Sequence, residues 1–158
     1  AFAYQFPIDA MIRELKFGGQ LAYAGVLGRA VARALRHSAL LAEPPDLLVP
    51  VPLHAARLRA RGFNQSLEIS RSLAQAWAVT LAPGVALRAR ATAPQTGLEA
   101  DARLRNLRDA FTVVRPVCGR AVAILDDVIT TGATVCELAR MLKQSGARRV
   151  VAIGVARA

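Results

Sequence analysis

The sequence contains 158 residues, 54% of them hydrophobic, and has a formal net charge of +10 at pH 7. This length suits a single domain with its own core, and no apolar run approaches the roughly 18 residues of a membrane-spanning helix. Two cysteines without a CxxC pair, Cys118 and Cys136, exclude a disulfide scaffold and a structural zinc site, so we expect two buried packing residues in a cytoplasmic protein.

The first half of the chain predicts two helices, a buried strand and a third helix. Apolar residues at positions 8, 11, 12 and 15 have helical spacing and stop before Gly18-Gly19, and positions 27, 31, 34 and 35 repeat the pattern. The apolar run 46–52, closed by prolines, is typical of a buried parallel strand. Residues 64–77 predict a helix, 85–87 a short strand, and 89–109 a loop without clear periodicity.

The last third of the chain predicts a strand, a helix and a second strand. Residues 122–125 and 150–155 are continuous apolar runs, and the helix between them ends at Ser145-Gly146, where glycine suits the C′ position. This order is a βαβ unit, which requires a parallel sheet with a right-handed crossover. We therefore predict an α/β fold of one domain spanning 1–158. Its mostly parallel sheet is flanked by helices, with residues 1–36 as a helical cap near the sheet's carboxyl edge and 46–158 as a ligand-binding core.

Positive charge is concentrated in the middle of the chain. Residues 52–120 contain eleven arginines and four acidic residues, whereas 1–51 and 121–158 carry net charges of only +1 and +2. Arginine suits bidentate contacts with phosphate, so this segment favours nucleic acid or a small phosphorylated ligand. A genomic bias toward arginine explains why only Lys16 and Lys143 are lysines, but it does not explain the scarcity of acids.

The segment after the predicted strand 122–125 carries the chemistry. Ligands of βαβ units bind just beyond the carboxyl ends of the strands, and here that position holds DDVITTGAT at 126–134. Its three threonines lie beside a helix N-terminus whose N–H groups favour a phosphate, and Gly132 lets the backbone approach an anion. Asp126 and Asp127 suit ligand hydroxyls and a divalent cation. The pattern indicates a ribose 5-phosphate, although a capped helix with two solvated aspartates has the same parts. P-loop and GxGxxG motifs are absent.

At this segment the sequence resembles a known family. LDDVITTGAT is similar to the phosphoribosyl pyrophosphate signature of type I phosphoribosyltransferases. The whole chain resembles the ComF family, which is linked with competence and DNA uptake and includes GntX-like proteins. The resemblance rests on residues 12–17 ending in LKF, VPVPLHAARLRARGFNQS at 49–66, residues 92–95 and RLRNLRDAF at 103–111. ComF proteins commonly carry a cysteine-rich zinc segment, which we do not expect in this chain.

The resemblance implies a binding site for phosphoribosyl pyrophosphate and Mg²⁺. Asp126 and Asp127 would hold the ribose hydroxyls, with Mg²⁺ bound near them through the ligand and not by direct ligation. The loop after the first predicted strand would hold the pyrophosphate, with Arg61 neutralising charge, and residues 89–109 would close over the reaction centre. Arg90 and Arg103 join the two aspartates as catalytic candidates. The other substrate-binding candidates are Thr130, Thr131, Gly132, Ala133, Thr134, Pro52, Leu53, His54, Asn64, Gln65, Thr92, Gln95 and Asn106.

Several of these residues also have a simpler structural explanation. Asn64 either binds substrate or caps the third helix, and His54 is either a ligand contact or a structural hydrogen-bond donor. Arg57, Arg59 and Arg61 alternate as if all three faced one anion-rich space, although a solvated loop has the same pattern. Four aromatic residues lack interleaved basic residues, so we expect them in the core. They are Phe2, Tyr4, Phe6 and Trp77.

The resemblance implies transfer of a phosphoribosyl group to a nitrogen nucleophile, such as a nucleobase or another amine, with release of pyrophosphate. Catalysis would be mainly electrostatic and would need no covalent nucleophile. Two alternatives stay open because one fold hosts many functions. One is a non-catalytic accessory of DNA uptake that binds partner proteins, and the other is a ligand-sensing regulator that binds nucleic acid through the arginine-rich middle. The acceptor and the oligomeric state are not readable from the sequence.

Overall fold

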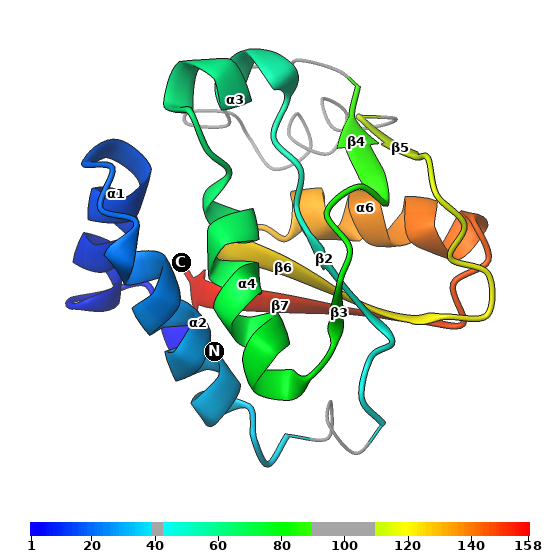
Figure 1. Cartoon of the computed structure of the whole chain (residues 1–158), viewed down its shortest axis with the longest axis horizontal. Helices are drawn as coiled ribbons and strands as arrows, with labels where there is room; N and C mark the ends of the chain where they lie inside the picture. The colour runs from blue at the N-terminus through cyan, green and yellow to red at the C-terminus, as the bar shows by residue number, and fades with distance from the viewer. Residues whose placement is uncertain (39–42, 90–109) are drawn as a thin grey trace.

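The computed structural model describes residues 1–38, 43–89 and 110–158. Within these ranges the chain forms a five-stranded sheet of order β1-β7-β6-β2-β3, in which all neighbouring strands are parallel (Figure 1). The α/β fold with a mostly parallel sheet is therefore confirmed. The sheet strands are β1 (Phe2–Ala3), β2 (Leu47–Pro50), β3 (Thr80–Leu81), β6 (Ala121–Ile129) and β7 (Arg149–Arg157). An antiparallel pair consists of β4 (Ala86–Arg88) and β5 (Phe111–Val113). The helices are α1 (Ile8–Phe17), α2 (Ala22–Ala34), α3 (Ala55–Arg61), α4 (Gln65–Trp77) and α6 (Ala133–Gln144).

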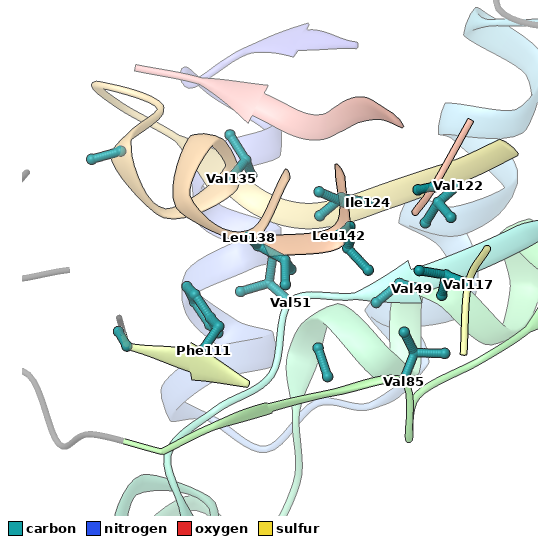
Figure 2. Packing of buried hydrophobic residues seen from close by; sticks show 14 residues of the cluster. Val49, Val51, Val85, Phe111, Val117, Val122, Ile124, Val135, Leu138 and Leu142 are labelled. Atoms are coloured by element: carbon teal, nitrogen blue, oxygen red, sulfur yellow. The ribbon is translucent and has the colours of Figure 1, made fainter. Parts of the chain in front are cut away.

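Strand β6 contributes side chains to both hydrophobic clusters of the protein. Val122 and Ile124 pack in the cluster that contains α6, whereas Ala123 and Leu125 pack with α1, α2 and α4. Successive strand residues point to opposite faces, so helices cover both sides of the sheet. Figure 2 shows the first cluster, which contains Leu142 of α6 and Ile124 of β6. The sheet and the helices on its two faces form three layers, and these layers leave the carboxyl ends of β2 and β6 open for a ligand.

Most predicted elements are present, and one helix is new. The β6–α6–β7 unit is the predicted βαβ unit, and α4 begins at Gln65, one residue after the predicted start. Helix α3 was not predicted, because it is seven residues long and buries none of its side chains. It begins after His54, whose Nδ1 accepts a hydrogen bond from the N–H of Ala56 at 3.2 Å, and it ends at Gly62 with φ +84°.

Two expectations about burial are wrong. Cys118 and Cys136 are exposed and free, because one lies in the turn before β6 and the other lies off the buried stripe of α6. Phe6 is 82% exposed and Tyr4 is 36% exposed, since both belong to the short segment between the edge strand β1 and α1. The other two aromatics, Phe2 and Trp77, pack against the cluster of α1, α2 and α4.

Close packing of α2 against α4 predicts a strong effect of one added methyl group. At Gly28 a Cβ atom would lie 2.6 Å from the carbonyl oxygen of Ile69 and 2.8 Å from Cβ of Ser72. Because a backbone oxygen cannot rotate away, we expect Gly28→Ala to lower the free energy of unfolding by about 2 kcal/mol. Gly25→Ala, on the same helix, would meet only side-chain atoms, the nearest a nitrogen of Arg29 at 3.3 Å, and should raise the free energy of unfolding by up to about 1 kcal/mol. Urea denaturation of both variants measures the difference, and equal stabilities would contradict this interpretation.

Candidate functional site

A polar cavity of about 200 Å³ lies at the carboxyl edge of the sheet, where the predicted signature begins within the last residues of β6. It combines two carboxylates, Asp126 and Asp127, with cationic side chains from three other elements. These cations are Lys16 of α1, Arg57 and Arg61 of α3, and Arg88 of β4. A smaller hollow of about 40 Å³ adjoins the cavity, because residues 126, 128 and 134 line both.

Asp126 is held at the floor of this cavity. Its Oδ1 accepts hydrogen bonds from Oγ of Ser66 at 3.3 Å and from the N–H of Asp127 at 3.0 Å. Burial and the negative charge of Asp127 raise the pKa of Asp126 from 3.8 to about 7. The protonation of a carboxyl group with such a raised pKa depends on any cation or hydroxyl placed beside it.

Asp127 is 4% exposed and forms an ion pair with Lys16, in the last turn of α1. The N-terminal helices therefore reach the carboxyl edge of the sheet and supply a charge to the acidic pair. A buried carboxylate needs such a partner, because transfer of an unpaired charge from water into a protein interior is costly.

Helix α3 places the three alternating arginines on two different faces. Residues four apart share a helix face, so Arg57 and Arg61 line the cavity, while Arg59 is exposed and does not line it. The expectation that all three face one space is therefore wrong for Arg59. Nη1 of Arg61 donates to Oε1 of Gln65 at 2.5 Å, and its guanidinium lies 5.6 Å from the ring centre of Phe17. Arg61 is thus oriented by two contacts before any ligand arrives.

The smaller hollow is formed by the loop that leads into α6. Gly132 is the N-cap residue of α6 with φ +81°, a conformation that favours glycine. The N–H of Ala133 donates to Oγ1 of Thr131 at 3.4 Å. Thr130 and Thr134 also line this hollow, together with Ala133 and Val135 of the first helical turn. The predicted phosphate loop therefore brings three threonine hydroxyls to the N-terminus of a helix, a position that favours an anion.

Other predicted residues lie in different places. Asn64 caps α4, since its Oδ1 accepts from the N–H of Ser66 at 3.0 Å and its Nδ2 donates to the carbonyl of Val51 at 3.0 Å. His54 caps α3 and lines neither hollow of the site, and Pro52 lines an apolar hollow beside Asn64. Leu53 and Gln65, two predicted substrate-binding residues, line the main cavity. Five candidates lie outside the described residues: Arg90, Thr92, Gln95, Arg103 and Asn106.

Three polar or charged residues of the cavity were not predicted as site residues. Lys16 lies in the LKF segment and is one of only two lysines in a chain rich in arginine. This rarity was the one sequence feature that could have marked Lys16 as a site residue. Ser66 follows the helix cap and Arg88 ends a short strand, and neither position has a pattern that points to a ligand. These three residues reach the cavity only through the tertiary fold.

The raised pKa of Asp126 predicts a pH-dependent stability. Between about pH 4 and pH 7 the folded protein holds a proton that the unfolded chain has lost, so the free energy of unfolding should fall as the pH rises through this window. Asp126→Asn keeps a neutral group in the same place. We expect this variant to have a flatter profile and to be more stable than the wild type above pH 7. Urea denaturation of both proteins across this pH range tests the prediction. Parallel dependences of the unfolding free energy on pH would contradict the raised pKa of Asp126.

Comparison with known proteins identifies relatives of this chain. The chain is 38% identical over 149 residues to DNA utilization protein YhgH of Escherichia coli K12, covering 93% of this chain and 66% of that protein. It is 32% identical over 160 residues to Competence protein F of Haemophilus influenzae, covering 98% of this chain and 70% of that protein. No family model matches the sequence.

Two solved structures have the same fold. The glutamine phosphoribosylpyrophosphate amidotransferase of B. subtilis matches with a TM-score of 0.55 and 22% identity, over 84% of this chain and 26% of that one. The purine phosphoribosyltransferase of Pyrococcus horikoshii matches with a TM-score of 0.50 and 17% identity, over 83% of this chain and 70% of that one.

The chain has the fold of the type I phosphoribosyltransferases. It belongs to the ComF family, which includes Competence protein F and the YhgH proteins. It spans 66% of the length of the YhgH protein of Escherichia coli K12. None of the helices in the described ranges is long and apolar enough to cross a membrane.

Proposed function

We propose that this protein binds phosphoribosyl pyrophosphate at the carboxyl edge of the sheet. The observation that carries the proposal is one cavity in which two adjacent carboxylates of β6 lie opposite cationic side chains and beside a helix N-terminus. This ligand presents vicinal hydroxyls, a 5-phosphate and a pyrophosphate. Carboxylates accept from the hydroxyls, the loop before α6 takes the 5-phosphate, and Arg57 and Arg61 contact the pyrophosphate.

The donor set also fits Mg²⁺ bound together with the ligand. Magnesium usually takes one or two protein carboxylates plus phosphate oxygens and waters. Asp126 and Asp127 would hold Mg²⁺ near them through the bound ligand and not by direct ligation. In the part of the chain that the structure describes, no group of three or more His, Cys, Asp or Glu side chains is placed to hold a metal ion by itself. When bound, Mg²⁺ neutralises negative charge on the pyrophosphate.

The reaction that we propose is phosphoribosyl transfer. The bond between C1 of the ribose and the pyrophosphate oxygen breaks, and C1 forms a bond to a nitrogen nucleophile that gives up a proton. Positive charge develops on the ribose and negative charge on the leaving pyrophosphate. Arg61, already oriented by Gln65 and Phe17, stabilises that negative charge without further reorganisation.

The test is calorimetric titration of phosphoribosyl pyrophosphate with Mg²⁺ into the wild type and Asp126→Asn. We expect micromolar binding that weakens about tenfold in the variant, because hydrogen bonds to a charged group are worth about 1.5–3 kcal/mol. The introduced carboxamide keeps an oxygen that can accept from Ser66, so the fold should persist. Glu14→Gln, which removes an exposed charge from α1, serves as the control. Absence of binding to folded wild-type protein would reject the proposal.

A second candidate function is a non-catalytic accessory role in DNA uptake. The relatives named DNA utilization protein and Competence protein F support a link with DNA handling. The two exposed free cysteines fit a reducing, cytoplasmic location. The enzyme releases pyrophosphate in the presence of a suitable amine, whereas an accessory protein binds the ligand without turnover and captures a protein or DNA partner.

A further inference from the structure

A second cavity, of about 530 Å³, lies at the opposite end of α4 from the acidic pair. Figure 1 shows α2 and α4 side by side, and the cavity lies between the C-terminal ends of these helices and the segment before β2. Gln65 and Ser66, at the start of α4, line the first cavity, whereas Trp77, at its end, lines the second. A helix of this length separates the two by roughly 18 Å, so they are distinct sites.

Three arginines form the charged wall of this cavity. Arg29, Arg33 and Arg36 follow one another at i, i+4 and i+7, so they share one face of α2 and of the turn that follows it. The cavity has no acidic lining residue among the described residues. Like charges at this spacing repel each other. The arrangement therefore leaves an uncompensated positive field over about 10 Å of helix.

These arginines differ from those on other helices of the protein. Arg13, Arg71 and Arg140 each pair with an acidic residue three or four positions away on the same helix. Within the described ranges, the guanidinium groups of the three cavity arginines have no hydrogen bond or ion pair to another residue. A solvated helix face with local ion pairs does not explain them. An anion in the cavity would supply the missing countercharge.

Trp77 gives the cavity an aromatic side. The residue packs against the cluster of α1, α2 and α4 and also lines the cavity. Its indole N–H is buried and has no hydrogen-bond acceptor in the described structure. Buried donors without a partner are rare in folded proteins. An indole beside guanidinium groups offers a stacking surface for a planar ring together with bidentate hydrogen-bond donors for phosphate.

We propose that this second cavity binds a free nucleotide that carries two or more phosphates. The arginines hold the phosphate groups, and the base lies against Trp77. Three guanidinium groups spread over two helical turns match a chain of phosphates better than a single one. The volume falls in the range of pockets that enclose one small molecule. The proposal does not depend on phosphoribosyl transfer at the first cavity.

The protein carries its own probe for this experiment, because Trp77 is the single tryptophan of the chain. ADP and AMP are titrated separately into the full chain while indole fluorescence is followed. We expect saturable quenching by ADP, weaker binding of AMP, and at least about tenfold weaker ADP binding in Arg29→Gln/Arg33→Gln. The side chains of Arg29 and Arg33 are exposed, so the double variant should fold. If the double variant does not fold, Arg36→Gln, which lies beyond the end of α2, gives a second test.

Two matched variants distinguish binding in this cavity from a general charge effect and from binding in the first cavity. Arg71→Gln removes one positive charge from α4 outside both cavities, and Arg57→Gln alters only the first cavity, so both should bind ADP as the wild type does. The proposal is overturned if ADP causes no saturable quenching, or if Arg71→Gln weakens binding as much as the double variant. Loss of ADP binding in Arg57→Gln would place the nucleotide in the first cavity instead. Tighter binding of oligothymidylate with increasing length would indicate a strand-binding surface and also reject a mononucleotide site.

Discussion

Lys16→Met is expected to lower the free energy of unfolding by about 3 kcal/mol, the largest stability effect that we predict. The substitution keeps most of the side-chain length but removes the charge that pairs with Asp127. Asp127 is 4% exposed, so water replaces the lost ammonium group only in small part. Breaking a buried pair from one side typically costs about 3–5 kcal/mol, and partial exposure of Lys16 places this pair near the lower limit.

Urea denaturation at neutral pH measures this effect, and a double variant identifies its cause. Lys16→Met/Asp127→Asn removes both charges, so it should recover a large part of the stability lost in Lys16→Met. Lys143→Met is the control, because that lysine donates to the carbonyl of Arg148 at an exposed site and should cost less than about 1 kcal/mol. If Lys16→Met unfolds at the same urea concentration as the wild type, the ion pair does not contribute to stability.

The pair also explains why the N-terminal helices belong to the functional edge of the sheet. Lys16 is far from Asp127 in sequence, and α1 carries it there because Ile12 and Leu15 anchor the helix in the cluster beneath. The amphipathic pattern of α1 was readable, and so was the acidic signature. Their contact was not, because an ion pair between distant segments leaves no local pattern in one sequence.

The parts of the site that sequence could predict are those built within one continuous segment. The loop from Asp126 to Thr134 contains its own strand end, turn glycine and helix start, so its chemistry followed from residue types and order. The opposite wall is assembled from α1, α3, α4 and β4. Helix α3 is too short and too exposed to show apolar periodicity, which is why its three arginines were expected to face one space.

The helical geometry of α3 also determines the largest ligand effect that we predict. Arg61→Gln is expected to weaken binding of phosphoribosyl pyrophosphate by about ten- to hundredfold, because it removes a charge-assisted contact worth about 1.5–3 kcal/mol. Arg61 lines the cavity and is oriented by Gln65 and by the ring of Phe17. Calorimetric titration with Mg²⁺ measures the change. A lysine cannot reproduce the planar fork, so Arg61→Lys should recover only part of the affinity.

Arg59→Gln is the matched control, since it removes the same charge from the same helix on the side away from the cavity. If a small ligand is bound by the cavity, Arg61→Gln loses affinity and Arg59→Gln retains it. A long polyanion bound by the general positive field of the middle segment should instead be weakened by both variants and be strongly dependent on salt. Equal effects on phosphoribosyl pyrophosphate would mean that net charge, and not the geometry of α3, governs binding. The two arginines lie two residues apart in the sequence, and only the helix between them makes their roles different.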